Sequence, residues 1–157
     1  MVAHVTIEYI IMIPLLVLQI FLFPWATSAM MDIWVNARRE LALKDAASNL
    51  ESAIQQLYSS LSSSEISAGT IVYVPELPAY IEDCPFEATG YVYQFLNSSK
   101  ILRITLKLLV YGNTADASVI LGENVEWRSS KFISNSTDAA IVITKYSNGS
   151  LVFMFRS

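Results

Sequence analysis

Residues 9–31 limit the possible folds of this chain more than any other stretch. They read YIIMIPLLVLQIFLFPWATSAMM and contain no charged residue. A helix on the surface of a soluble domain has a polar face at a spacing of 3.6 residues, but this segment is apolar on every side. About 20 residues at a rise of 1.5 Å each span a hydrocarbon core of roughly 30 Å. The segment therefore predicts a helix that is surrounded by lipid or by other apolar helices.

The composition and charge of the chain agree with this and exclude one class of partner. Hydrophobic residues make up 54% of the chain and charged residues only 15%, whereas soluble domains carry about 25% charged residues. The apolar excess lies in the first 35 residues. The net charge is −4 and the pI is about 4.9. Because binding to nucleic acid requires a basic patch, we expect no nucleic-acid partner.

The chain contains one cysteine, Cys84, and one histidine, His4. A single cysteine cannot form a disulfide within the chain. A His/Cys metal site or a Ser-His-Asp triad cannot be assembled in one chain either, because the only histidine precedes the apolar segment. We therefore predict that the protein is not an enzyme and has no cofactor and no metal site built from His and Cys.

The apolar segment continues into a longer helix. Pro14 and Pro24 lie inside it, and each removes one backbone donor, so we expect a proline-kinked helix. From residue 32 to about residue 61 the pattern becomes amphipathic, with apolar residues at steps of three and four. These are Ile33, Ala37, Leu41, Ala47, Leu50, Ala53, Ile54, Leu57 and Leu61. Since no glycine or proline occurs between Trp25 and Leu61, one helix of roughly 55 residues, about 80 Å long, is expected.

The rest of the chain has the pattern of a β domain. A serine-rich stretch at 59–69 predicts the end of the helix. Runs of β-branched and aromatic residues then predict strands at 70–74, 91–96, 101–111, 117–121, 125–128, 140–146 and 150–155. Turn residues separate them, among them Gly90, Gly112 and the pair Asn148-Gly149, which predicts a two-residue hairpin turn.

These patterns predict an α+β fold. A long N-terminal α-helix, first apolar and then amphipathic, precedes an antiparallel β-rich domain, either a sheet or a small sandwich. The expected domains are the helix at 1–62 and the β-rich surface domain at 63–157. Within the helix, residues 1–31 form the membrane or filament-core part and residues 32–62 the amphipathic part.

The stretch HVTIEYIIMIPLLVLQIFLF resembles the N-terminus of archaeal type IV pilin-like proteins of the class III signal peptide type. Ile7-Glu8-Tyr9 fits the family motif directly, and Thr6 stands where serine is usual. The plan of the whole chain is also similar to that superfamily, archaellins included. The resemblance implies cleavage before His4, which would make Glu8 the fifth mature residue. The family has a basic leader before this point, whereas only Met-Val-Ala precedes His4 here.

The resemblance implies a pilin, a structural subunit that polymerises into an extracellular filament serving adhesion or surface attachment. The chain would be inserted in the cytoplasmic membrane, then join copies of itself in a helical homopolymer at the cell surface. Its other partners would be the pilus assembly machinery and the prepilin-processing machinery. The residues expected in the filament core are Glu8, Tyr9, Pro14, Leu18, Phe21, Pro24 and Trp25. The alternatives are a monomeric, single-pass, membrane-anchored surface binding protein, or an archaellin of a swimming filament.

Glu8 has two interpretations. In bacterial pilins the equivalent acid is thought to meet the N-terminal amine of a neighbouring subunit, and Glu8 could do the same. Alternatively, Glu8 is a carboxylate at the water interface that the helix N-terminus favours.

Three sequons of the form N-x-[ST] lie in predicted turns and are candidates for N-linked glycans. They begin at Asn97, Asn135 and Asn148.

Three further groups have a functional and a structural interpretation. Cys84 could be a reactive thiol or form an intersubunit disulfide, or it could be a small buried hydrophobe. Four carboxylates in one proline-containing loop could bind a hard cation such as calcium, or they could form a solvated acidic loop. They are Glu76, Glu82, Asp83 and Glu87. Aromatic residues could form an adhesive surface or pack within strands. They are Tyr73, Tyr80, Tyr91, Tyr93 and Trp127.

Overall fold

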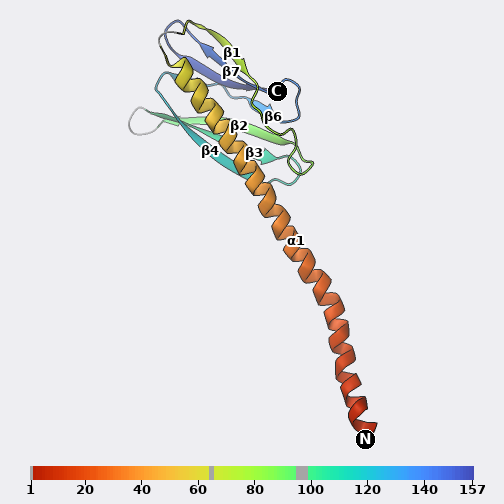
Figure 1. The fold of residues 1–157 in the computed structure, drawn as a ribbon. Coiled ribbons are helices and arrows are strands. Elements are labelled where there is room, and N and C mark those ends of the chain that lie inside the picture. Colours follow the sequence, from red (N-terminus) through yellow and green to blue (C-terminus); the bar gives the residue numbers. More distant parts are fainter. Residues whose placement is uncertain (1, 64–65, 95–98) are drawn as a thin grey trace. The chain divides into compact units, whose positions relative to one another are not determined.

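The computed structural model describes residues 2–63, 66–94 and 99–157, with the backbone alone for residues 2–9 and 11. A single helix, α1 (Val2–Leu61), precedes eight strands in the described part of the chain (Figure 1). The predicted α+β fold, a long N-terminal helix followed by a β-rich domain, is confirmed. The chain divides into two compact units inside α1, a helical unit (Met1–Arg38) and a β unit (Arg39–Ser157).

Helix α1 is uninterrupted at both prolines and ends where the serine-rich stretch predicts. Pro14 and Pro24 lie inside the helix. Three residues after Pro24, the Thr27 hydroxyl donates a hydrogen bond of 2.8 Å to the carbonyl oxygen of Phe23, the local bond that Thr side chains form in helices. At the C-terminus of α1, Lys145 Nζ donates to the carbonyl oxygens of Leu61 at 2.8 Å and Ser63 at 2.6 Å. This cation satisfies the carbonyl of the last helical residue, Leu61, which has no partner within the helix, and a carbonyl of the segment that follows.

The strands form two four-stranded sheets. The first sheet contains, in spatial order, β1 (Gly69–Tyr73), β7 (Ala140–Lys145), β8 (Leu151–Arg156) and β5 (Val125–Trp127). The second contains β4 (Thr114–Leu121), β3 (Lys100–Leu108), β2 (Phe86–Gln94) and β6 (Lys131–Ile133). All strand pairs are antiparallel except β5 with β8, which is parallel. The antiparallel prediction thus holds with one exception.

Three strand bounds need correction, and one strand was not predicted. Strand β2 begins at Phe86 and not at residue 91, strand β3 ends at Leu108 and not at residue 111, and strand β4 begins at Thr114 and not at residue 117. The unpredicted strand is β6. The first half of β2, FEATG, has few β-branched residues, and its glycine resembles a turn signal. A strand of three residues such as β6 is too short for an alternating pattern to be recognised.

Gly90 is a strand residue, and its lack of a side chain is explained by the neighbouring Trp127. A Cβ added at Gly90 would overlap the ring of Trp127. The Trp127 ring packs edge-on against Phe155, with ring centroids 4.8 Å apart. A glycine inside a strand often marks such a close approach, so Gly90 makes room for an aromatic contact of the core.

Gly90→Ala is expected to destabilise the β unit by about 1–3 kcal/mol, because the added methyl group displaces Trp127. The matched control is Gly69→Ala in β1, where a Cβ would meet nothing within 4 Å. Thermal unfolding of the full chain in detergent measures both. Equal melting temperatures for the two variants would contradict the close-packing explanation.

The C-terminal third of α1 belongs to the core of the β unit. Its buried residues share one cluster with the inward residues of both sheets. They are Leu43, Ala46, Ala47, Leu50, Ala53, Ile54 and Leu61, with Leu57 partly buried. The predicted stripe is therefore wrong at its N-terminal end, since Ile33, Ala37 and Leu41 are exposed. The regular spacing of three and four residues begins at Leu43, which the sequence pattern did not single out.

The hairpin between β7 and β8 is confirmed, but its turn differs from the predicted two-residue type. Tyr146 N donates to Ser150 O at 2.9 Å and Gly149 N donates to Tyr146 O at 3.0 Å. Gly149 has a φ of 82°, and Asn148 is not among the positive-φ residues. This is a three-residue loop whose glycine takes the left-handed conformation.

Candidate functional site

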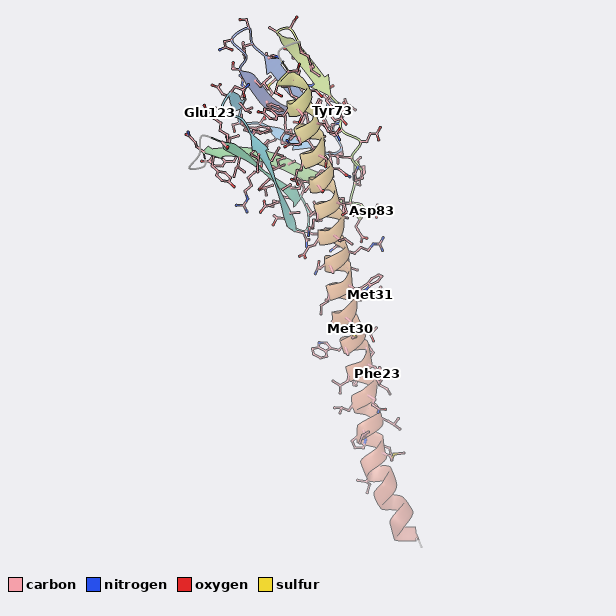
Figure 2. All side chains as sticks on the ribbon, turned by 60° about the vertical axis from the view of Figure 1, so that its left-hand side comes forward. Phe23, Met30, Met31, Tyr73, Asp83 and Glu123 are labelled. Carbon is pink, nitrogen blue, oxygen red and sulfur yellow. The ribbon has the colours of Figure 1, made fainter. Side chains whose placement is uncertain are left out.

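The helical unit presents an apolar surface on all sides. From Met12 to Trp34 the large apolar side chains are exposed, for example Leu18 at 58% and Phe21 at 73%. Figure 2 shows the side chains of Phe23, Met30 and Met31 projecting from α1. This part of α1 is long and apolar enough to cross a membrane, judged by length and composition. An apolar patch of this size on a soluble protein marks an interaction surface.

Most of the residues predicted for the filament core lie on this exposed surface. Pro14, Leu18, Phe21, Pro24 and Trp25 are all exposed. Residues 14, 18, 21 and 25 are separated by steps of four, three and four, which places them on one face of the helix. Glu8 and Tyr9 lie within α1, but their side chains are outside the described part of the structure. One helix face thus brings together four of the seven predicted residues.

Two of the three predicted sequons lie in exposed turns of the β unit. Asn135 is exposed within a turn in which Ser136 N donates to Ile133 O at 3.1 Å. Asn148 is exposed, and its Oδ1 accepts hydrogen bonds from Ser150 N at 3.0 Å and Ser150 Oγ at 2.7 Å. Asn97 lies outside the described residues. Both described asparagines are thus accessible from solvent.

Cys84 is buried, which agrees with the structural interpretation of this residue. Its Sγ accepts a hydrogen bond from Val110 N at 3.3 Å. The preceding turn has a feature that the sequence did not reveal, since Glu82 and Asp83 have φ angles of 48° and 61°. Non-glycine residues rarely adopt this left-handed conformation.

The carboxylates of the acidic loop do not form a cation site in the described part of the structure. Among the described residues, no group of three or more His, Cys, Asp or Glu side chains could hold a metal ion. Glu87 instead forms an ion pair of 3.0 Å with Lys131, which joins β2 to β6. For Glu87 the structure therefore gives a role in strand pairing.

The aromatic residues divide into two groups. Trp127 packs against the core, as a strand-packing residue should. The four tyrosines are exposed, and this exposure does not agree with the strand-packing interpretation. They are Tyr73, Tyr80, Tyr91 and Tyr93. Tyrosine is enriched at protein interfaces because its ring is apolar and its hydroxyl is polar.

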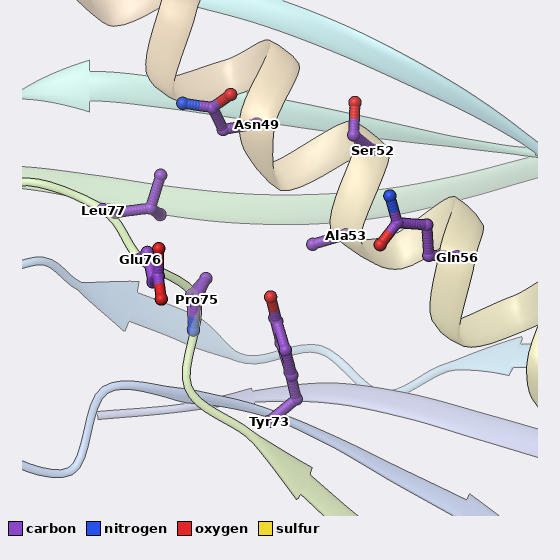
Figure 3. A pocket seen from close by; sticks show the side chains of 8 residues that line it. All are labelled: Asn49, Ser52, Ala53, Gln56, Tyr73, Pro75, Glu76 and Leu77. Carbon is purple, nitrogen blue, oxygen red and sulfur yellow. The ribbon is translucent and has the colours of Figure 1, made fainter.

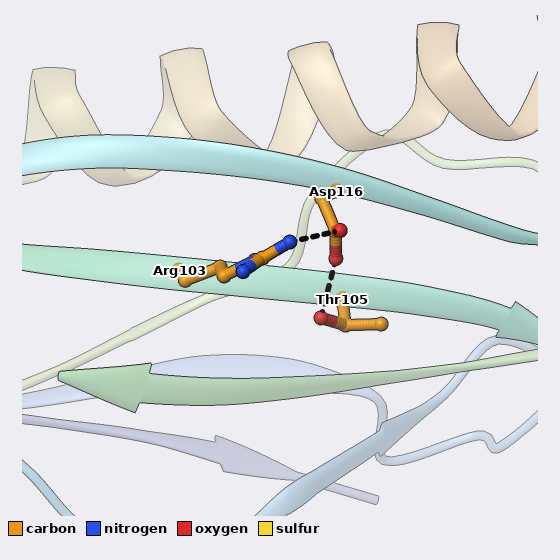
Figure 4. A network of polar contacts seen from close by, with 3 residues as sticks. All are labelled: Arg103, Thr105 and Asp116. Atoms are coloured by element: carbon orange, nitrogen blue, oxygen red, sulfur yellow. Dashed lines mark hydrogen bonds and ion pairs between the residues drawn. The ribbon is translucent and has the colours of Figure 1, made fainter.

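A polar network that was not predicted lies on strands β3 and β4 (Figure 4). Asp116 accepts hydrogen bonds of 2.6 Å from the Thr105 hydroxyl and 2.6 Å from Arg103 Nη2. Thr105 and Asp116 are direct cross-strand neighbours. The Thr105 hydrogen bond, followed by the Arg103 hydrogen bond, holds the pKa of Asp116 below its usual value. The hydrogen bond to Asp116 in turn raises the pKa of Arg103.

The β unit is expected to lose the stabilisation that Asp116 contributes when the solution becomes acidic. Its carboxyl pKa is lower in the folded than in the unfolded chain, so its contribution is present above the unfolded pKa, about 3.9. That contribution is lost as the pH falls through the folded pKa. Unfolding measured against pH should show a shallower acid slope for Asp116→Asn and an intermediate slope for Thr105→Val. The change is small because exposed pairs are screened; an unchanged slope in both variants would contradict it.

A polar cleft of about 270 Å³ lies between α1 and the segment after β1. Its lining residues are Asn49, Ser52, Ala53, Gln56, Tyr73, Pro75, Glu76 and Leu77. In Figure 3 the hydroxyl of Tyr73 points toward α1. The amide, hydroxyl and carboxylate groups can hydrogen-bond a polar ligand or the backbone of another chain.

Two contacts within the β unit, between its part of α1 and its loops, could not be predicted because they link residues distant in sequence. The Tyr58 hydroxyl accepts a hydrogen bond of 3.0 Å from Gly122 N. The Arg39 guanidinium carbon lies 3.5 Å from the ring centroid of Tyr111. A sequence pattern contains no signal for either pair.

Comparison of the chain with protein-family models, curated proteins and solved structures found no match.

Proposed function

We propose that this chain is a pilin, the structural subunit of an extracellular type IV pilus-like filament that serves adhesion or surface attachment. The observation that carries the proposal is the exposed surface of residues 12–31, which is apolar around its whole circumference. A surface of this kind is stable in lipid and equally stable among identical helices. Covering it removes apolar area from water at about 25 cal/mol per Å². Lipid covers it before assembly, and sister helices cover it in the filament.

The way in which α1 joins the β unit also favours a filament subunit. A membrane anchor needs only a flexible connection between its span and its domain. Here Leu43, Leu50 and Ile54 are fully buried in the core of the β unit, so the last turns of α1 are part of that domain. This agrees with the expectation for a filament subunit, in which the amphipathic part of the helix packs against the subunit's own β domain.

The filament contact is heterologous and does not close, as any helical polymer requires. The face that contains Pro14, Leu18, Phe21 and Trp25 supplies the helix–helix contact. Glu8 pairs with the N-terminal amine of a neighbouring subunit, because a carboxylate in apolar surroundings is costly unless it has a partner. The pairing sets the axial register of the subunits.

Electron microscopy tests the proposal against its main alternative. Negative-stain images of material sheared from cells that produce this chain should show regular fibres that contain it. The alternative, a monomeric membrane-anchored surface binding protein, would give a membrane-fraction monomer that only detergent releases, and that result would refute the pilin proposal. An archaellin would also form fibres, but loss of the chain would then abolish swimming and leave attachment intact.

The proposed location outside the cell predicts glycosylation of the β unit. Peptide mass spectrometry of native material should find a glycan on at least one of Asn97, Asn135 and Asn148. Thr137→Ala and Ser150→Ala, which destroy the sequons of Asn135 and Asn148 without changing the asparagines, are the matched controls. Unmodified peptides for all three asparagines would contradict the prediction.

A further inference from the structure

Strand β1 (Gly69–Tyr73) is an edge strand of the first sheet, and it has no charge to protect that edge. All five of its residues are exposed, among them Val72 at 48%. No charged residue occurs from residue 66 to residue 75, and the strand contains no proline. The edge strand β4 of the second sheet, by contrast, includes Asp116. Proteins usually protect a free sheet edge with charged residues, proline or a bulge, so β1 is open to pairing with another strand.

The hydrogen-bond pattern shows which residues of β1 direct their backbone groups outward. In the β7–β8 hairpin, Tyr146 N donates to Ser150 O. Because bonded and non-bonded pairs alternate along an antiparallel ladder, the even-numbered residues of β7 bond to β8. The odd-numbered residues of β7 therefore bond to β1, where the paired positions are 69, 71 and 73. It follows that the N–H and C=O groups of Thr70 and Val72 point away from the sheet.

The contact between Thr70 and Thr144 agrees with this pattern. The two residues are opposite each other, and their hydroxyl oxygens lie 3.2 Å apart. Opposite side chains approach most closely in the pairs that do not exchange backbone hydrogen bonds. Among the described residues, no hydrogen bond reaches the outward backbone groups of Thr70 and Val72. The edge of β1 therefore offers two donors and two acceptors that are not used within the described part of the chain.

We propose that β1 pairs with β1 of a second copy of this chain, antiparallel and centred on Ile71. In this register Ile71 lies opposite Ile71 of the second copy, Thr70 opposite Val72, and Gly69 opposite Tyr73. Thr70 and Val72 are the outward residues, so each Thr70 exchanges backbone hydrogen bonds with the Val72 opposite it. Every residue of the strand then has a partner, and the first sheet continues from one copy into the other.

The side chains of β1 select a second copy as the partner, because the strand is complementary to itself. Pairs of β-branched residues on adjacent strands are favourable, and here they are Ile71 with Ile71 and Thr70 with Val72. The ring of Tyr73 covers the backbone of Gly69, an arrangement that compensates for a glycine at a sheet edge. Like charges directly opposite each other would be destabilising, and an uncharged strand has none.

This contact goes beyond the proposed function and does not depend on it. A twofold contact uses the same surface on both copies and closes after two, whereas the helix–helix contact of a filament must not close. The β1 contact therefore links chains in pairs through their β units. It is available to a filament subunit and equally to a membrane-anchored protein, so its test does not require filaments.

Disulfide crosslinking of the full chain in phospholipid vesicles tests the contact. Opposite residues of a pair without backbone hydrogen bonds have Cα atoms about 4.5 Å apart, which a disulfide can bridge. Ile71→Cys should therefore give a disulfide-linked dimer on mild oxidation. Ile120→Cys is the matched control, because Ile120 is 66% exposed on the edge strand β4. The unsubstituted chain, whose only cysteine, Cys84, is buried, gives the background.

A mixture of two variants tests the register. Thr70→Cys and Val72→Cys chains, reconstituted together, should form a mixed dimer, because these two residues lie opposite each other. Each variant alone should crosslink weakly, since the same residue of the second copy lies two positions further along the strand, about 6.7 Å away in that direction. The mixture also keeps the test valid if Ile71→Cys folds poorly.

The expected result is a dimer yield several-fold higher at position 71 than at position 120, with the mixed dimer in several-fold excess over either same-residue dimer. Equal yields at positions 71 and 120 would overturn the proposal, because random collision would then explain both. A mixed dimer without excess would overturn it as well, because β1 would not have the proposed register. Val72→Lys, which places like charges close together across the contact, should remove the Ile71→Cys dimer and leave the Ile120→Cys background unchanged.

Discussion

Leu18→Asp is expected to abolish filaments and to leave the β unit folded. Leu18 is 58% exposed in the middle of the apolar segment, so an assembled core would surround it with other subunits. An aspartate at the centre of a membrane helix costs about 2.5–3.5 kcal/mol, and a filament would repeat that cost in every subunit. The β unit should be unaffected, because Leu18 belongs to the separate helical unit. Filament yield by electron microscopy and protection of the Cys84 thiol measure the two parts of this expectation.

Ile120→Asp is the matched control for this experiment. Ile120 is about as exposed as Leu18 but lies on β4 in the β unit, so the same charge should leave a filament core intact. Recovery of the chain in the membrane fraction distinguishes a failure of assembly from a failure of insertion. Normal fibre abundance for Leu18→Asp would exclude residue 18 from the filament core. Loss of fibres in both variants would show that the assembly surface includes the outside of the β unit.

The large elements of this fold could be predicted because each has a strong local pattern. The helix has no break between its apolar part and its amphipathic part, and its end coincides with the serine-rich stretch at 59–69. The β7–β8 hairpin could be predicted from Asn148-Gly149 and the apolar runs on either side. The apolar surface that forms the candidate site could be predicted as well, since exposure on all sides follows from the lack of a polar face.

The details that failed depend on contacts between residues distant in sequence. Gly90 resembles a turn signal locally, but it is a strand residue that pairs with Ile104 of β3. The residue is a glycine because Trp127 occupies the space where a Cβ would lie. Lys145 caps α1 across 84 residues of sequence. The parallel pairing of β5 with β8 also follows from tertiary packing, because a strand of three residues has no pattern that specifies its direction. Local patterns contain none of this information.

The start of the buried stripe in α1 was the most informative error. Helical periodicity assigned Leu41 and Leu50 to one apolar face, yet Leu41 is 62% exposed and Leu50 is fully buried. The two residues are nine positions apart, which is 180° from an integral number of turns at 100° per residue. They therefore lie on opposite faces, and Leu43, seven positions before Leu50, begins the true stripe. Periodicity predicted an amphipathic helix but not which leucine first enters the core.

Leu50→Ala is expected to destabilise the β unit by about 2–5 kcal/mol, because it leaves a cavity among fully buried side chains. Cys84 provides the measurement, since it is the only cysteine and is buried. A thiol reagent reaches it only when the β unit opens, so its rate follows the open population when closing is fast. A loss of 2–5 kcal/mol corresponds to a rise of roughly 30-fold or more in that rate.

Leu41→Ala is the control, because it deletes the same atoms from an exposed position of the same helix. Its effect on Cys84 reactivity should be within about twofold, since surface substitutions usually change stability by less than 0.5 kcal/mol. Leu41 is an exposed leucine of α1. Its exposure groups it with the apolar surface that a membrane or neighbouring subunits would cover. If Leu41→Ala weakens filaments and spares the β unit while Leu50→Ala does the reverse, α1 changes function between these two leucines. Equal rates of Cys84 modification in the two variants would instead place both residues in one continuous core.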